Sequence, residues 1–254
     1  MTDVDARAGG PVAGDGPVAG DPAAAGGVRL VERVEGGRSW PVLLWAAGPD
    51  WRMVSTAVVG GGVGPRSWWL NAKVTKDYHH PDPAAHVREI AGFVGAGPGG
   101  GVGMLTAADV TRWTCAASDG ATAVATVGLG LPVWAAAPDA VVARETGTIN
   151  VLVRVPVPLS DAALVNAVVT ATEAKTQALL EAGVPGTGTS SDAVCIACPD
   201  PAALPDVPVE DYGGPRSPWG LRIARAVHEA VALGTADWTA QHPAGDPHRR
   251  WPAS

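Results

Sequence analysis

Residues 172–199, TEAKTQALLEAGVPGTGTSSDAVCIACP, bring a lysine, carboxylates and a run of hydroxyl side chains into one short stretch. Lys175 stands among apolar positions of a predicted helix, where burying an unpaired ammonium group is costly. Gly183 ends this helix, and the turn that follows contains four Ser or Thr residues and Asp192. The glycines of the turn allow backbone N–H groups to approach a ligand or converge on an oxyanion. Lysine, carboxylate and hydroxyl side chains with such N–H groups are the functional groups that amide or ester chemistry uses.

Such chemistry needs an activated water or a side-chain nucleophile, an oxyanion stabiliser and a proton for the leaving group. The sequence has no G-x-S-x-G motif and no convincing Ser/His/Asp set. The hypothesis is therefore that Glu173 or Asp192 activates water, or that a hydroxyl of the turn is the nucleophile. Lys175 would stabilise charge or orient a carboxylate, and N–H groups around Gly188 and Thr189 would bind the oxyanion. For Lys175 alone, snorkelling to solvent is the simpler interpretation.

The helix that carries Lys175 is predicted to run from a Ser160 cap to Ala182. Helical periodicity assigns one apolar face to Leu164, Val165, Val168, Val169 and Leu179, interrupted by Thr172, Lys175 and Thr176. Glu173 lies at the edge of this apolar face, and the opposite, solvent-facing side is assigned to Asn166, Thr170, Gln177 and Glu181.

In the predicted strand 147–155, GTINVLVRV, the residue types alternate between its two faces. Ile149, Val151, Val153 and Val155 share one face, while Thr148, Asn150, Leu152 and Arg154 share the other. Two interpretations remain open: the second face is solvated, or Thr148 and Asn150 line a site near the start of the strand.

Three other motifs have simpler explanations than the chemistry they suggest. The G-x-G-x-x-G match at 95–100 follows a predicted helix, whereas a dinucleotide site needs it between a strand and a helix, so we interpret it as a helix stop. Cys195 and Cys198 lie three apart on a strand and point to opposite faces, which favours buried, reduced thiols, as for Cys115. The polar stretch 76–86 is better explained as a pocket rim than as a metal site, and His228 as a surface residue.

Further elements follow from local signals. Segments 53–59 and 67–74 look like neighbouring strands, and Asp82 with Pro83 begins a helix that runs to Gly95. Strands 111–118 and 121–129 flank the hairpin turn at Asp119 and Gly120. Strand 192–198 and an amphipathic helix at 217–233 complete the set. Together they predict an α/β fold of the α+β type, a single layered sandwich with a mixed, largely antiparallel sheet covered by helices.

The composition sets limits on organisation and partners. The 254 residues, 46% of them hydrophobic, can bury one core, predicted at 28–234 between low-complexity tails at 1–27 and 235–254. A net charge of −7 argues against nucleic acid and anionic membrane surfaces as partners. Three cysteines make no disulfide framework, and we find no signal peptide and no apolar run long enough to span a membrane. A cytoplasmic location is expected.

Five blocks of the sequence resemble, in order, the adenosylcobinamide amidohydrolase family. They are WLNAKV (69–74), GMLTAADV (103–110), the long block 147–181, GTGTSSDAV (186–194) and GGPRSPWG (213–220). The resemblance covers residues 28–234. It implies a role in corrinoid salvage: hydrolysis of the amide that joins the aminopropanol arm to the corrin side chain, giving adenosylcobyric acid and aminopropanol.

The resemblance also shapes the expected site. The cobalt corrinoid would be the substrate, so no separate cofactor is expected; a metal site is not predicted, and metal dependence stays open. Asn71, Asp109, Thr148 and Asn150 are polar residues in matching blocks and could hold the amide-fringed corrin, together with Gly188. Two alternatives stay open: a non-catalytic corrinoid carrier, with Trp68 or Trp69 against the ring, and a hydrolase of another amide.

Overall fold

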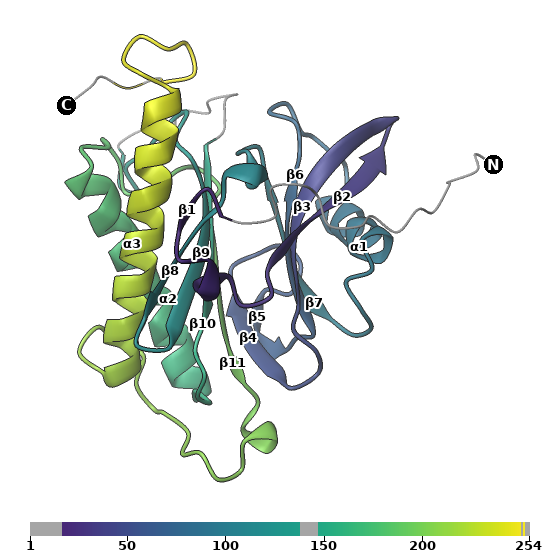
Figure 1. Ribbon diagram of the computed structural model, residues 1–254, viewed down its shortest axis with the longest axis vertical. Coiled ribbons are helices and arrows are strands. Elements are labelled where there is room, and N and C mark those ends of the chain that lie inside the picture. Colours follow the sequence, from purple (N-terminus) through teal and green to yellow (C-terminus); the bar gives the residue numbers. More distant parts are fainter. Residues whose placement is uncertain (1–16, 138–146, 250, 252–254) are drawn as a thin grey trace.

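The computed structural model describes residues 17–137, 147–249 and 251. Across the molecule, a pair of helices, a seven-stranded sheet, a four-stranded sheet and a further helix form successive layers (Figure 1). The predicted fold class, a layered α/β sandwich with mixed, largely antiparallel pairing, is confirmed. The strands belong to two sheets that pack face to face.

The larger sheet holds the strand whose start was predicted to line a site. In spatial order its strands are β1 (Ala19–Gly20), β8 (Thr114–Ser118), β9 (Ala121–Gly128), β10 (Thr148–Arg154), β11 (Ala193–Pro199), β4 (Trp51–Ser55) and β5 (Gly62–Pro65). β10 pairs parallel with β11 and antiparallel with β9, so the starts of β10 and β11 lie side by side.

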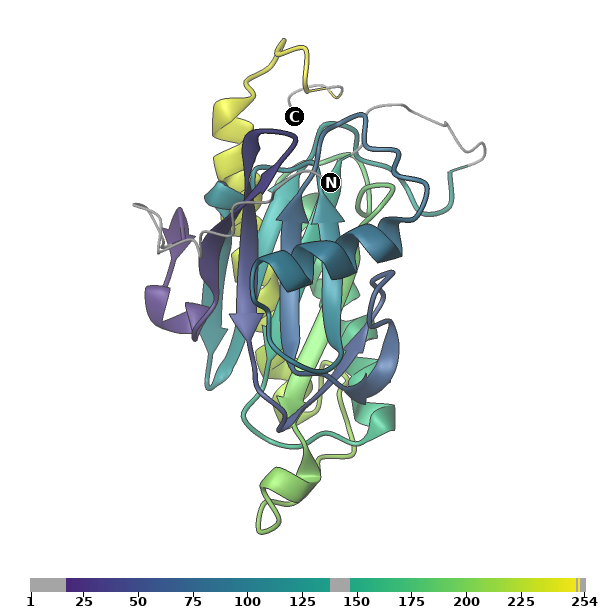
Figure 2. The ribbon, with the colours of Figure 1, turned by 90° about the vertical axis from the view of Figure 1, so that its right-hand side faces the viewer.

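The smaller sheet packs against the larger one on one face and carries a helix on the other. Its order is β2 (Arg29–Glu35), β3 (Arg38–Ala46), β6 (Trp68–Lys73) and β7 (Gly101–Thr106), and only β6 and β7 pair in parallel. Helix α1 (Pro83–Phe93) lies across β6 and β7 (Figure 2). As predicted, Asp82 caps α1 by accepting a hydrogen bond from the Ala85 N–H at 2.8 Å.

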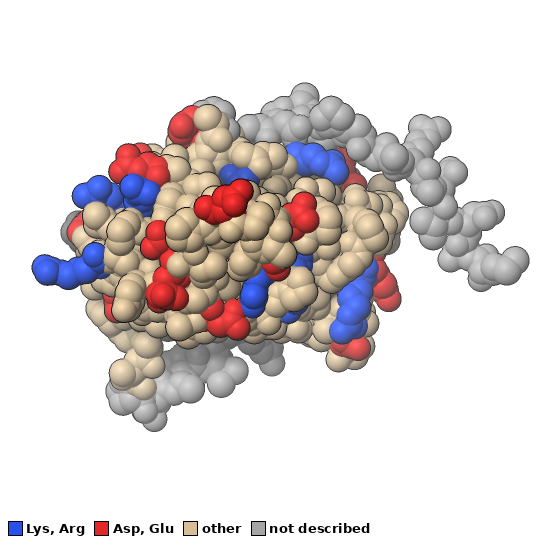
Figure 3. All heavy atoms as spheres, turned by 90° about the horizontal axis from the view of Figure 1, so that it is seen from below, with Lys and Arg blue, Asp and Glu red and all other residues tan. Residues whose placement is uncertain are grey.

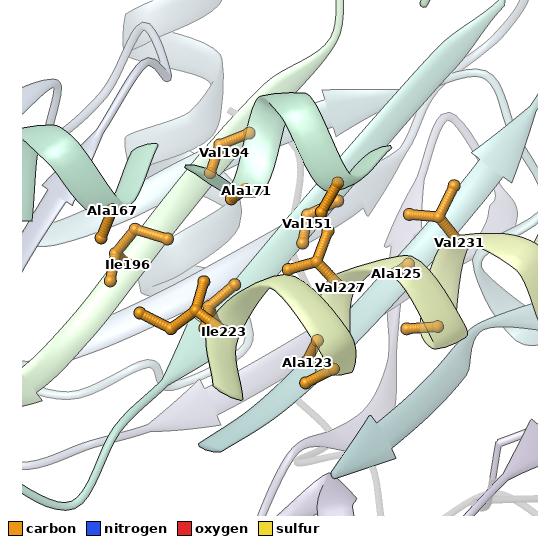
Figure 4. Packing of buried hydrophobic residues seen from close by; sticks show 14 of the residues in the cluster. Ala123, Ala125, Val151, Ala167, Ala171, Val194, Ile196, Ile223, Val227 and Val231 are labelled. Carbon is orange, nitrogen blue, oxygen red and sulfur yellow. The ribbon is translucent and has the colours of Figure 1, made fainter. Parts of the chain in front are cut away.

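Two long helices, α2 (Asp161–Glu181) and α3 (Pro218–Gln241), cover the outer face of the larger sheet. Figure 4 shows side chains of both helices meeting those of β9, β10 and β11. Ala167 and Ala171 of α2 lie over Val194 and Ile196 of β11, whereas Ala123 and Ala125 of β9 lie against α3. Small side chains bring helix and sheet backbones close, which removes apolar surface from water at high packing density. Three short 3₁₀ helices complete the described part: η1 (Pro22–Ala25), η2 (Val110–Arg112) and η3 (Pro201–Ala203).

The two sheets enclose a second apolar layer, which includes Leu43, Trp69, Trp113, Leu152 and Cys195. β10 is therefore buried on both faces. Its predicted alternation is confirmed, because Ile149, Val151 and Val153 face the helices. The interpretation of its other face as solvated is wrong, since that face meets the second sheet.

The apolar face predicted for α2 was also wrong in part. Val165 and Val169 are exposed, whereas Thr170 is buried and donates a hydrogen bond to the Gly213 carbonyl oxygen at 2.8 Å. The residues that face the core are mostly alanines, to which the periodicity argument gave less weight than to valine. The predicted cap at Ser160 is confirmed, with its hydroxyl 3.2 Å from the Ala163 nitrogen.

The segments 53–59 and 67–74 are not neighbours. Their strands β4 and β6 belong to different sheets, and residues of the intervening glycine-rich stretch form β5, which pairs antiparallel with β4. Gly60 and Gly62 have φ angles of +74°, which lets the chain reverse there. The predicted hairpin at 119–120 is confirmed, with positive φ at both Asp119 and Gly120.

Both predicted boundaries of the domain differ from the structure. β1 and η1 lie within the predicted N-terminal tail, and β1 pairs with β8. At the other end α3 continues to Gln241, and Trp251 packs against Trp238. In both places a few apolar side chains pack into the fold, although the sequence around them has a low-complexity composition.

The surface gives two further observations. On the face shown in Figure 3, Lys and Arg side chains are interspersed with Asp and Glu among uncharged residues. Within the described ranges, no helix has both the length and the apolar content that crossing a bilayer requires.

Candidate active site

Lys175 and Asp192 form a buried ion pair between α2 and the turn before β11. The Lys175 Nζ atom contacts Asp192 Oδ2, and the two side chains are only 7% and 11% exposed. The snorkelling interpretation of Lys175 is therefore wrong: its ammonium group reaches a carboxylate instead of solvent. The charge is paired, as burial requires.

The Asp192 carboxylate accepts further hydrogen bonds that fix the turn. Its Oδ1 atom accepts from the Ile149 backbone N–H at 2.9 Å and from the Thr189 hydroxyl, and its Oδ2 atom also accepts from the Thr189 N–H at 3.1 Å. These contacts join the turn to the start of β10. Because its acceptor positions are occupied by protein donors, Asp192 is better placed to hold the turn than to take a proton from water.

Gly188 leaves room for this ion pair. A Cβ atom at this position would collide with both Lys175 Nζ and Asp192 Oδ2. The Gly188 carbonyl oxygen accepts from the Val133 N–H at 2.8 Å, which ties the turn to the segment after β9. The Thr189 N–H, predicted to bind an oxyanion, is already committed to Asp192.

Thr148 and Ser191 place two hydroxyl groups on the wall of a cavity. Their oxygens are 2.8 Å apart, and Ser191 Oγ is 3.2 Å from the Gly147 carbonyl oxygen. The cavity measures about 500 Å³, and residues of the segment 74–79 also line it. This segment and the start of β10 lie at the upper end of the molecule in Figure 1. The sequence singled out Thr148 and the hydroxyl groups of the turn 187–191, which include Ser191, but did not distinguish Ser191 from the other three.

Glu173 lies away from this group. It is exposed and belongs to a shallow surface hollow formed by α2 itself. Residues two apart on an α-helix point roughly 200° apart, so Glu173 and Lys175 cannot face the same cluster.

Asn71 and Asn150 are brought together, but inside the molecule. Asn150 Nδ2 donates to Asn71 Oδ1 at 2.9 Å and Asn71 Nδ2 donates to the Thr126 hydroxyl at 2.9 Å. All three side chains are at most 1% exposed. Asn150 also donates to the carbonyl oxygen of Leu105, a residue that lines the 500 Å³ cavity. Both asparagines therefore join the two sheets behind the cavity and do not line it.

Asp109 lies in a different cavity. It caps η2 by accepting from the Thr111 N–H at 3.0 Å and the Thr111 hydroxyl at 2.7 Å. This cavity, about 270 Å³, is also lined by Lys73, whose amine donates to the Ala108 carbonyl oxygen at 3.0 Å. Burial lowers the pKa of Lys73, and the charge of Asp109 opposes that shift.

A larger cavity, about 660 Å³, is also lined by residues of the segment 74–79. Its lining includes Glu35, Tyr78, His80 and His86, which confirms the interpretation of 76–86 as a pocket rim. Tyr78 and His79 line both this cavity and the one with Ser191. Glu35 was missed because it comes from a strand about fifty residues earlier in the chain.

The cysteines take no part in these cavities. Cys195 faces the layer between the sheets and Cys198 faces the helices, so the predicted divergence of the C-x-x-C pair is confirmed. Burial raises the pKa of the Cys198 thiol to about 11. Within the described residues, no group of three or more His, Cys, Asp or Glu side chains is arranged to hold a metal ion.

Comparison with known proteins identifies the family. The family model described as adenosylcobinamide amidohydrolase matches residues 27–243. This chain belongs to the adenosylcobinamide amidohydrolase family. The resemblance drawn from the sequence blocks is thereby confirmed, and the chain is a hydrolase that acts on an amide.

Two curated relatives carry the same name. An adenosylcobinamide amidohydrolase of Methanosarcina mazei is 31% identical over 189 residues, which cover 73% of this chain and 90% of the relative. One of Halobacterium salinarum is 43% identical over 86 residues, which cover 34% of each chain.

Proposed function

We propose that this amidohydrolase cleaves the amide between the aminopropanol arm and the corrin side chain of adenosylcobinamide. The products are aminopropanol and adenosylcobyric acid. Membership of the family supports the substrate. One observation supports the location of the active site. The hydroxyl groups of Thr148 and Ser191 lie at the wall of a cavity, and the buried Lys175–Asp192 pair holds in place the turn that carries Ser191.

Ser191 is the nucleophile in this proposal. Asp192 is occupied by protein donors and Glu173 is remote, so neither activates water at this wall. The Ser191 oxygen attacks the amide carbonyl carbon, the C–N bond breaks, and aminopropanol leaves. Water then hydrolyses the ester on Ser191 and releases the acid. Thr148 orients the Ser191 hydroxyl, and the Lys175–Asp192 pair holds the turn that carries it.

The two cavities beside the segment 74–79 provide room for a large substrate. The scissile amide occupies the 500 Å³ cavity, and the bulkier part of the corrinoid extends towards the 660 Å³ cavity. The carrier alternative placed Trp68 or Trp69 against the ring, but these side chains are only 5% and 1% exposed. Burial of the lysine–carboxylate cluster next to a cavity favours the enzyme over the carrier.

Mass spectrometry of adenosylcobinamide incubated with the purified enzyme tests the proposal. We expect loss of the aminopropanol arm and a free side-chain carboxylate, with the cobalt–carbon bond intact. Tight binding with no change in mass over a long incubation would instead support the carrier.

A further inference from the structure

Three side chains from different elements form a hydrogen-bonded chain at the 660 Å³ cavity. The Tyr78 hydroxyl, in the segment between β6 and α1, is 2.9 Å from His86 Nδ1. His86, on α1, places its Nε2 atom 3.1 Å from Glu35 Oε1 at the end of β2. Arg33 binds the other Glu35 oxygen at 3.0 Å. The order phenol, imidazole, carboxylate is that of a catalytic relay in which each group orients the next.

The protonation of these groups follows from their partners. Burial by itself would raise the pKa of Glu35, but the hydrogen bond and charge of Arg33, together with His86, outweigh it and hold that pKa below its usual value. An ionised Glu35 only accepts, so the His86 Nε2 atom carries a proton. In the neutral imidazole, Nδ1 then has a lone pair and accepts the Tyr78 proton.

The position of Tyr78 connects this chain with the hydroxyl pair. His86 is buried, whereas Tyr78 is half-buried and lines both cavities. The smaller cavity is lined by Tyr78 together with Thr148 and Ser191. Burial and the charge of Glu35 raise the pKa of Tyr78, so the phenol is protonated at rest. Tyr78 therefore connects Glu35 and the buried His86 with the cavity that Ser191 lines.

We propose that Tyr78 is a catalytic proton relay for the amide cleavage, with His86 and Glu35 as its positioning residues. This inference rests on the proposed function. As the Ser191 oxygen forms its bond to the carbonyl carbon, its proton passes to the Tyr78 oxygen, and the Tyr78 proton passes to His86 Nδ1. The carbonyl electron pair moves to oxygen.

The second half of the step reverses the proton path. The carbonyl re-forms and the C–N bond breaks, with its electron pair on nitrogen. The Tyr78 oxygen donates a proton to that nitrogen and regains one from His86. Aminopropanol leaves as a neutral amine, His86 returns to its resting state, and the step needs no reactant other than the substrate. Glu35 stabilises the transient imidazolium in between.

Tyr78→Phe tests the relay, because it removes the hydroxyl and keeps the ring. We expect kcat to fall by roughly a hundredfold or more, the scale of a lost general acid–base group, with KM changed little. Tyr212→Phe is the matched control, since Tyr212 is 75% exposed. Melting temperatures of both variants check that the fold is kept.

A second measurement separates a relay from a merely structural contact. His86→Gln alone should also lower kcat, and adding it to Tyr78→Phe should cost little more, because the residues act as one unit. If Tyr78→Phe matches Tyr212→Phe in kcat, or raises KM alone, the relay is overturned. A parent enzyme that releases no aminopropanol would instead refute the proposed function itself.

Discussion

Lys175 and Asp192 are seventeen residues apart in the sequence, and their contact joins α2 to the turn that precedes β11. The turn between them is held on both sides, because Thr176 Oγ1 also donates to the Thr187 carbonyl oxygen at 3.1 Å. The position of Ser191 therefore depends on an ion pair in which Ser191 takes no part.

Lys175→Met should destabilise the protein more than its loss of packing suggests. The substitution keeps most of the apolar stem and leaves the Asp192 carboxylate buried without its cation, which costs about 3–5 kcal/mol. Urea unfolding measures the effect. Lys175→Met combined with Asp192→Asn should recover part of this loss, since no unpaired charge remains. Equal stability of the single and the double variant would contradict the account.

Ser191→Ala should abolish turnover to within the sensitivity of the assay, with the fold unchanged, because the hydroxyl is the proposed nucleophile. Ser190→Ala is the matched control: both serines are exposed in the same turn, but only Ser191 lines the cavity. Aminopropanol release follows both variants. Similar rates for the two would move the nucleophile elsewhere.

Gly188→Ala should destabilise the protein by about 1–3 kcal/mol, because the added methyl group meets Lys175 and Asp192. Gly92→Ala is the comparison: this glycine lies within α1 and has open space around it. There the change should be neutral or stabilising by up to about 1 kcal/mol. Thermal unfolding of the two variants shows whether the space at residue 188 is needed for the stability of the protein.

Glu173→Gln should keep kcat within about twofold of the parent, since its side chain lies outside the cluster and the cavity. A hundredfold loss, the scale expected for a general base, would restore Glu173 as the base that activates water and would contradict Ser191 as the nucleophile.

Deletion of residues 1–27 should lower the melting temperature. It removes β1, the buried side chain of Ala24, and the carbonyl oxygen of Ala24 that accepts from Arg154 at 2.7 Å. Burial lowers the pKa of Arg154 to about 10. Loss of a hydrogen-bond acceptor for this buried guanidinium group therefore destabilises the folded protein. Deletion of residues 1–16 alone is the control, and its Gly, Ala and Asp-rich composition predicts little effect.

Local signals in the sequence predicted local structure well. The caps at Ser160 and Asp82 and the turn at Asp119 and Gly120 were correct because each depends on a few adjacent residues. Tertiary relations were predicted less well. The sequence does not show that β4 and β6 belong to different sheets, because pairing partners depend on contacts between distant segments.

The candidate site shows the same contrast between local and tertiary relations. Lys175, Gly188, Thr189 and Asp192 come together because they lie near one another in the chain. Asn71 and Asn150 do contact each other, but their polar character marked a buried link between sheets and not a surface for substrate. The relay at Tyr78 was missed because Glu35 and His86 meet only through the packing of α1 on the smaller sheet.

The burial of the cysteines has a practical consequence for studying this enzyme. All three are free and buried, and burial raises the pKa of each thiol, so at neutral pH they react slowly with maleimides and similar reagents. A cysteine introduced at an exposed position, such as Ser190, would then be the reactive thiol of choice. A fluorophore attached there would report on substrate entering the neighbouring cavity without replacement of the native cysteines.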